Sequence, residues 1–162
     1  MSGDKGRRLF KRRVLGREDI ESLKEEAGRL LSDEVSNAVS RAETEDGATV
    51  FFFIRDALLA RDNGILFPTL VNPILDELPS IIVDMGAIPF VCNGADIMSP
   101  GIVRIEGEFG DDELVVVRDI EHGKALAVGK AMYSSEVVRD MDRGKAISNL
   151  HYVGDKIWDA IA

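Results

Sequence analysis

The twenty residues from Val83 to Ile102 carry the groups best suited to holding a ligand, in the order VDMGAIPFVCNGADIMSPGI. Gly86 and Gly94 are expected to free the backbone to turn, or to let another backbone approach closely. Asn93 is expected to begin a helix of one or two turns, which the following Pro-Gly pair would end. A helix N-terminus beside a glycine can hold a phosphate through backbone N–H groups. On this pattern alone, the alternative is that both glycines only close a tight barrel.

Other reactive residues do not form a recognisable catalytic site. No two of His122, His151 and Cys92 have metal-ligand spacing, and there is no CxxC. His122 is expected in an exposed loop, and Cys92 is expected to be an inert thiol buried within a strand. His151 is either a structural strand histidine or, beside Tyr152, a residue that stacks on a base. Glycine-rich nucleotide signatures are missing too, so we expect no enzyme, metal or cofactor.

Charge is distributed unevenly along the chain. The net charge is −9, yet residues 1–17 hold seven basic residues and one acid, so this segment carries +6 and the rest −15. We expect a basic strand over Arg7–Arg13 whose long side chains meet phosphates. These side chains are Arg8, Lys11, Arg12 and Arg13. The alternative is a solvated basic arm or a cloning remnant.

The first half of the chain predicts a small α/β layer. Apolar residues at helical spacing predict an amphipathic helix from Ile20 to Leu31, and a second short helix would run over Asp33–Val39 with Ser32 as its cap. Thr49–Arg55 is expected to be a buried strand, because its residues are mostly β-branched or aromatic.

Turn signals divide the rest of this half. Asp62-Asn63-Gly64 predicts a tight turn between apolar stretches. Pro68 suits the first turn of a helix running to about Leu78, although Pro73 would deform it.

The second half predicts a small barrel or sandwich of short strands. The six strand candidates are Ile81–Val83, Ala87–Val91, Ile102–Glu108, Leu114–Ile120, Ala125–Met132 and Ala146–Val153. Val103, Ile105 and Phe109 alternate with charged residues and should face inward. Small residues alternate along Ala125–Ala131, which permits close approach of another backbone.

Two short helices complete the expected fold. Ser134 should cap a helix over Ser135–Met141, and Asp155 should begin a terminal helix that carries Trp158. We therefore expect an α+β chain with an α/β domain over residues 1–78 and a mostly antiparallel β domain over residues 79–162.

The segment from Val83 to Ile102 resembles the signature of PUA domains, which pair an Asp-x-Gly-Ala turn with a later Gly-Ala-(Asp/Asn)-(Ile/Val)-Met-x-Pro-Gly stretch. The resemblance continues through Lys124–Lys130, Gly144–Ile147 and Asn149–Trp158. With Phe67–Leu70 upstream, these segments are similar to the malignant T-cell amplified sequence family and its archaeal relatives, in which a small α/β domain precedes a PUA pseudobarrel. The resemblance covers residues 65–160 well and residues 1–64 only loosely.

This resemblance implies RNA binding without catalytic residues. The RNA-binding surface it implies on this chain consists of Gly86, Ala87, Asn93, Gly94, Ala95, Asp96, Met98, Ser99, Lys130, Asn149, His151 and Tyr152. It further implies a translation accessory factor that contacts tRNA or rRNA on the small ribosomal subunit, beside a SUI1-domain partner. From Pro79 onward, however, fourteen acidic residues face eight basic ones, and phosphate contacts supply most non-specific affinity.

Two alternatives remain. The protein could be a protein–protein adaptor for a SUI1-domain partner, or the targeting subunit of an RNA-modifying enzyme. We expect a cytoplasmic protein, since the chain has one cysteine, no secretory signal and no apolar run long enough to cross a membrane.

Overall fold

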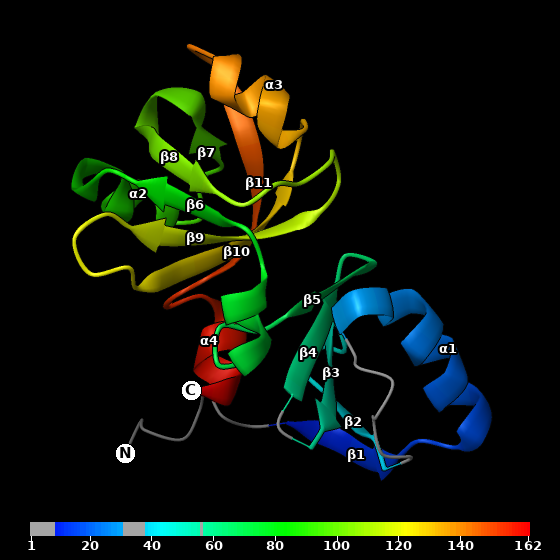
Figure 1. The fold of residues 1–162 in the computed structure, drawn as a ribbon. Helices are drawn as coiled ribbons and strands as arrows, with labels where there is room; N and C mark the ends of the chain where they lie inside the picture. The colour runs from blue at the N-terminus through cyan, green and yellow to red at the C-terminus, as the bar shows by residue number, and fades with distance from the viewer. Residues whose placement is uncertain (1–8, 31–37, 56) are drawn as a thin grey trace, which may run out of the picture. The chain divides into compact units, whose positions relative to one another are not determined.

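The computed structural model describes residues 9–30, 38–55 and 57–162 of the chain (Figure 1). The chain divides into two compact units, one of residues up to Ile74 together with Asp159–Ala162, and the other of Leu75–Trp158. Arg8 and most of the second helix expected over Asp33–Val39 lie outside the described residues, as does its cap, Ser32. In the described ranges no helix is both long and apolar enough to cross a bilayer.

The first unit contains a five-stranded antiparallel sheet in the order β1-β2-β3-β4-β5 (Figure 1). Its strands are β1 Phe10–Val14, β2 Ser40–Glu43, β3 Thr49–Ile54, β4 Ala57–Asp62 and β5 Ile65–Pro68. The predicted strand over Thr49–Arg55 and the turn at Asp62-Asn63-Gly64 are confirmed. Strands β2 and β4 were not predicted, because polar residues at their ends obscure the alternation of apolar and polar residues that marks a strand.

Helix α1, Arg17–Ala27, packs on one face of this sheet and continues into a 3₁₀ turn to Leu30. Its buried residues Ile20 and Leu23 share a core with Phe52 and Ile54 of β3. The predicted amphipathic helix is thus confirmed. Acidic residues in its first turn complement the helix dipole.

The helix predicted from Pro68 to Leu78 is wrong. Pro68 ends β5 opposite Leu59, at a sheet edge where the missing N–H of proline is tolerated. The hydroxyl of Thr69 and the amide of Asn72 then donate to the carbonyl of Leu58, at 2.9 and 3.2 Å. These bonds hold a turn, and only a short 3₁₀ helix, Pro73–Glu77, follows it.

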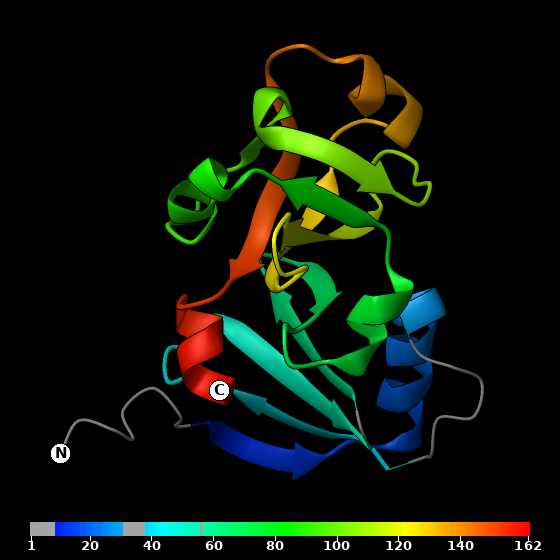
Figure 2. The same ribbon diagram turned by 60° about the vertical axis from the view of Figure 1, so that its left-hand side comes forward.

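The second unit is built on a curled six-stranded sheet in the order β7-β11-β10-β9-β6-β8. Its strands are β6 Ser80–Val83, β7 Ile97–Met98, β8 Ile102–Glu106, β9 Leu114–Asp119, β10 Ala125–Ala131 and β11 Lys145–Tyr152. All pairs are antiparallel except β6 with β9. Figure 2 shows the long strand β11, in orange, leading into the terminal helix. The mixed fold class and five of the six predicted strands are confirmed.

Alternating apolar residues of these strands fill the core of the second unit. Ile81, Val115, Val117 and Ile147 are fully buried. Val103, which was expected to face inward, is 49% exposed. The register shifts around it, because Ile82 and Val83 pair with Arg104 and Ile102, so Val103 is an extra residue in a β-bulge.

Gly129 marks the closest backbone approach in this sheet. A Cβ at this position would lie 2.4 Å from Cγ2 of Ile147 and 2.8 Å from the carbonyl oxygen of Ser148, both on β11. The close approach predicted from the small residues of Ala125–Ala131 is therefore confirmed at Gly129.

Both predicted helices of the second unit are present. Helix α3, Ser135–Asp140, is capped by the hydroxyl of Ser134, which accepts from the N–H of Val137. Helix α4, Lys156–Ile161, follows Asp155.

The carboxylate of Asp155 also contacts His151, whose ring is fully buried. Nδ1 of His151 lies 2.9 Å from the carboxylate, which also accepts from the N–H groups of Tyr152 and Trp158. Burial alone would raise the pKa of Asp155, but the hydrogen bond and charge of His151, with these two N–H groups, outweigh it and hold the pKa below its usual value.

We predict that Gly129→Ala destabilises the second unit, because the added methyl group overlaps Ile147 and the backbone of Ser148. Overpacking of this kind costs about 1–3 kcal/mol, measurable as a lower denaturant midpoint. Gly86→Ala is the matched control, since its Cβ would meet only a carboxylate oxygen of Asp84 at 3.9 Å. Equal stability of the Gly129 variant and the wild-type protein would contradict the packing described.

We predict that Asp155→Asn lowers the free energy of unfolding at neutral pH by roughly 1.5–3 kcal/mol, the usual contribution of hydrogen bonds to a charged group. Because the pKa of Asp155 is lowered in the fold, its contribution is complete above the unfolded value of about 3.9. That contribution is lost as pH falls through the lower folded value. Urea unfolding of both proteins from pH 7 to pH 3 should show the difference shrinking below about pH 4. A difference that does not change with pH would refute this role of the Asp155 carboxylate.

Candidate nucleic-acid interface

Two short helical pieces follow β6: the 3₁₀ turn Met85–Ala87 and helix α2, Ile88–Val91. The carboxylate of Asp84 caps the 3₁₀ turn by accepting from the N–H of Gly86 at 3.1 Å. The proline in the first turn of α2 lies where its missing N–H is not needed. The strand predicted over Ala87–Val91 is therefore wrong, because a short apolar run does not separate strand from helix and the cap and proline decide.

The helix expected to begin at Asn93 is wrong for a related reason. Asn93 lies in the turn that ends α2, and its N–H donates to the carbonyl of Phe90 at 3.1 Å. Strand β7 follows, and then a 3₁₀ turn, Ser99–Gly101. This segment therefore presents no helix N-terminus at Asn93.

The two glycines of this segment have different roles. Gly94 has φ +92°, and a Cβ there would lie 3.1 Å from the ring of Tyr152. Gly86 has no positive φ and only Asp84 nearby. The expected need for glycine is thus confirmed at Gly94 and wrong at Gly86.

Asn149 ties β11 to the loop after α2. Its Nδ2 donates to the carbonyls of Val91 and Ala95, each at 3.0 Å. Its backbone N–H donates to Oδ1 of Asp96 at 2.9 Å, while Oδ2 of Asp96 pairs with Lys145 at 3.5 Å. Asn149 and Asp96 therefore hold the loop in place, and their main polar groups are already engaged.

A hollow of about 320 Å³ opens between α2 and β7. Its lining residues are Asp84, Gly86, Ala87, Phe90, Val91, Asp96, Ile97, Met98, Pro100 and Gly101. Phe90 is 68% exposed and Met98 46% exposed at this hollow. Two large apolar side chains that remain in water beside a hollow are a typical mark of a binding site.

The structure brings together only part of the predicted RNA-binding set. Gly86, Ala87, Asp96 and Met98 line the hollow. The exposed residues Asn93 and Ala95, and the half-buried Gly94, Asn149 and Tyr152, belong to the adjoining loop and strand. Six further lining residues were not predicted: Asp84, Phe90, Val91, Ile97, Pro100 and Gly101. The sequence signal missed for Phe90 was a large aromatic residue directly after the proline in the first turn of a helix.

Two predicted contacts are corrected by burial. Ser99 is 7% exposed, and its hydroxyl donates to the carbonyl of Met141 at 2.8 Å. His151 is fully buried against Asp155, so the strand-histidine interpretation holds and stacking on a base does not. Both residues are polar, which suggested contact with a ligand, but each side chain instead binds a partner within the fold.

The remaining titratable candidates also lie apart from the hollow. Cys92 follows helix α2 and does not lie within a strand as expected, and burial raises the pKa of its half-buried thiol. His122 is exposed in its loop, as predicted. The described residues contain no group of three or more His, Cys, Asp or Glu side chains that could hold a metal ion.

The cations of the second unit are mostly neutralised by nearby carboxylates. Lys130 lies on β10 outside the lining of the hollow, and its Nζ is 3.8 Å from Asp112. Five ion pairs are formed by basic residues from Pro79 onward: Arg104–Glu106, Arg118–Asp76, Lys130–Asp112, Arg139–Glu108 and Lys145–Asp96. The hollow itself is lined by two carboxylates and no cation. Such a site favours an apolar or hydrogen-bond-donating group over a phosphate.

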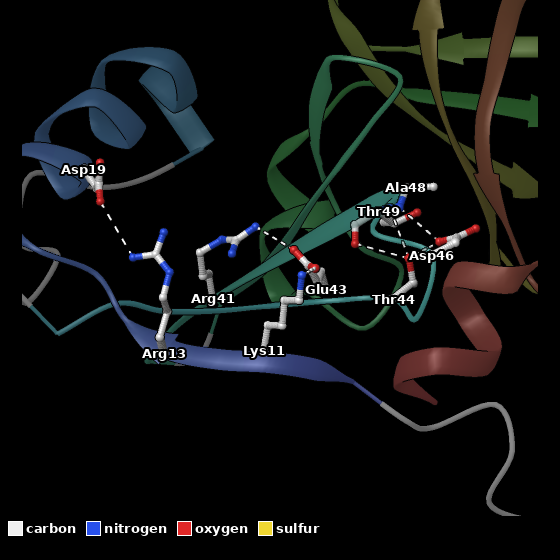
Figure 3. A network of polar contacts seen from close by, with 9 residues as sticks. All are labelled: Lys11, Arg13, Asp19, Arg41, Glu43, Thr44, Asp46, Ala48 and Thr49. Carbon is white, nitrogen blue, oxygen red and sulfur yellow. Dashed lines mark hydrogen bonds and ion pairs between the residues drawn. The ribbon is translucent and has the colours of Figure 1, made fainter.

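The basic strand expected near the N-terminus is present as β1, Phe10–Val14. Lys11, Arg12 and Arg13 are all exposed on it. Figure 3 shows Lys11 reaching Glu43, at 3.5 Å, and Arg13 reaching Asp19, at 4.0 Å.

Comparisons with known proteins agree with this architecture. The PUA domain profile matches residues 79–153. Uncharacterized protein MJ1432 of Methanocaldococcus jannaschii is 36% identical over 93% of this chain and 97% of its own length. The crystal structure of a PUA domain from Aeropyrum pernix, in a tartrate complex, has a TM-score of 0.78 at 25% identity and covers 95% of this chain and 91% of its own.

Two eukaryotic relatives match shorter stretches. Translation machinery-associated protein 20 of Eremothecium gossypii is 34% identical over 58% of this chain, and Malignant T-cell-amplified sequence 1 of Rattus norvegicus is 33% identical over 71%. The chain spans 56% and 62% of the lengths of these two relatives. The chain therefore belongs to the family of PUA-domain proteins that includes its full-length archaeal relative, and it resembles the Malignant T-cell-amplified sequence proteins over most of its length.

Proposed function

We propose that this protein is a non-catalytic, cytoplasmic RNA-binding factor of translation, which contacts tRNA or small-subunit rRNA. The observation that carries the proposal is the hollow beside α2, where Phe90 and Met98 stand exposed on a PUA domain. In this proposal the hollow receives an unpaired RNA base.

The chemistry of the hollow favours a base over a phosphate. Phe90 offers an aromatic face, and stacking of this kind contributes about 1–3 kcal/mol per base. One carboxylate oxygen of Asp84 accepts no hydrogen bond from the described residues, and carboxylates accept from the amino groups of bases. A phosphate would instead be repelled by Asp84 and Asp96. We therefore propose that the hollow binds an RNA base and not the phosphate expected from the sequence.

The names of the eukaryotic relatives support the link to translation. One is described as translation machinery-associated, and the chain aligns with 56% of its length. The specific RNA and the ribosomal contact are part of the proposal.

A second candidate function is that of an adaptor for a SUI1-domain protein. The observation that favours it is the neutralised surface of the second unit, where five basic residues are held by carboxylates. Pull-down from lysate before and after nuclease treatment separates the two functions, because an adaptor keeps its partner once RNA is removed.

We predict salt-sensitive binding to tRNA or small-subunit rRNA with a shallow slope. The logarithm of affinity should fall with the logarithm of salt by about 0.7 per neutralised phosphate for single-stranded contacts. Since most cations of the second unit are paired, we expect a slope that corresponds to only about one to three neutralised phosphates. Fluorescence anisotropy across a range of KCl concentrations measures it. Undetectable binding at low salt to any structured RNA would overturn the proposed function.

We predict that Phe90→Ala weakens RNA binding by about tenfold, because a stacking face is removed. Its stability should stay near that of the wild-type protein, since Phe90 is 68% exposed. Tyr133→Ala is the matched control: Tyr133 is an aromatic 43% exposed that does not line the hollow. Equal losses in both variants would show that the hollow is not the contact site.

A further inference from the structure

We propose that Arg12, whose guanidinium lies over the ring of Phe53, is a stacking platform for a second unpaired RNA base, at a site in the first unit separate from the hollow. The guanidinium carbon of Arg12 lies 4.3 Å from the centroid of the Phe53 ring. This inference rests on the proposed RNA binding, but it changes the role expected for Arg12 from phosphate contact to base stacking.

A β-bulge places Arg12 over Phe53. Phe10 pairs with Glu43 and Arg13 with Arg41, so the two residues Lys11 and Arg12 lie opposite a single residue of β2. Lys11 absorbs the extra residue with φ +51°. After the bulge, each side chain of β1 therefore points to the face opposite the one that an uninterrupted alternation would give.

The new alternation can be followed across the sheet. Val14 pairs with Ser40, which in turn pairs with Phe53, and directly paired residues point to the same face. Arg12 is two residues from Val14 and therefore shares this face. It is opposite to the face on which α1 packs against Phe52.

Of the three exposed cations on β1, Arg12 is the one without an ion pair in the described part of the chain. Lys11 reaches Glu43, which is also bound by Arg41 at 3.1 Å, and Arg13 reaches Asp19 (Figure 3). Carboxylates therefore partly offset the charges of the two neighbours, whereas Arg12 is paired only with an aromatic ring.

A second arginine–phenylalanine contact in the same sheet shows what a purely structural pair looks like. Arg61 lies 5.0 Å from the centroid of Phe52, which is only 4% exposed. Both Nε and Nη2 of Arg61 donate to the carboxylate of Glu26, so its donors are used inside the fold. Arg12 also lies over a phenylalanine ring, but it is exposed and forms no ion pair with a carboxylate among the described residues.

An unpaired base is the ligand that this arrangement fits best. A guanidinium stacked on an aromatic ring is fixed in a plane, and RNA bases stack on arginine planes. Val14, on the same face, is 74% exposed and offers apolar surface that a phosphate would not use. The edge N–H groups of Arg12 remain able to contact the phosphate that adjoins the stacked base.

Arg12→Lys tests the proposal, because lysine keeps the positive charge but lacks the planar guanidinium group on which a base could stack. The probe is a short single-stranded RNA of mixed sequence with one 2-aminopurine, whose fluorescence is quenched by stacking. We expect Arg12→Lys to lower affinity about tenfold, to reduce the quenching and to leave the salt slope unchanged. Arg61→Lys is the matched control and should leave affinity and quenching unaltered.

The experiment is repeated in a Phe90→Ala background, where the Arg12 loss should recur in full, since separate sites contribute additively. Phe53→Leu should reproduce the loss in any preparation whose circular dichroism matches the wild-type protein. Unaltered affinity and quenching in Arg12→Lys, with binding retained by the wild-type protein, would overturn this inference alone. Absence of RNA binding by the wild-type protein would overturn both the proposed function and this inference.

Discussion

The carboxamide of Asn149 ties β11 to the loop after α2, next to the hollow that is proposed to receive an RNA base. Its two N–H donors satisfy two carbonyls of the loop after α2, those of Val91 and Ala95. Each such bond contributes roughly 0.5–1.5 kcal/mol net, and the carbonyl of Val91 also accepts from the N–H of Gly94 at 3.1 Å. Aspartate has no donor for either carbonyl, so the amide is required at this position. This tie adds to the pairing of β7 with β11 and to the burial of Val91 in the core, and together these contacts position α2 and β7 on either side of the hollow.

The same side chain also contains an unfavourable feature. Oδ1 of Asn149 is buried without a hydrogen-bond partner among the described residues. A buried acceptor of this kind destabilises the fold, so its presence points to a need for the amide elsewhere. In the proposed function, that need is the fixed spacing between Phe90 and Met98.

Much of the fold could be predicted from local patterns, because each pattern has one dominant physical cause. Ser134 and Asp155 cap helices where their side chains reach free backbone N–H groups. Small residues along β10 predict the contact that Gly129 makes. The failures occur where a single residue overrides a pattern. A proline in the first turn suits the apolar run Ile88–Val91 to a helix, and one inserted residue exposes Val103 to solvent.

The site was less predictable, because residue type does not reveal burial. Ser99 and His151 are polar, yet both are enclosed and satisfied by partners far along the chain or at the next turn. Phe90 is apolar, yet it is exposed. Only the three-dimensional arrangement separates a polar group that supports the fold from an apolar group that is left for a ligand.

The acidity of the protein, a difficulty for RNA binding at first sight, is consistent with the kind of contact proposed. A surface whose cations are paired with its own carboxylates attracts RNA weakly at long range, so phosphate charge contributes little to affinity. In the proposed mode of binding, affinity then depends on short-range contacts with bases, at Phe90 in one unit and at Arg12 in the other. Such contacts require bases that are already unpaired and held in place. This favours an RNA within a large assembly, where the strand is presented in a fixed conformation, over RNA free in solution.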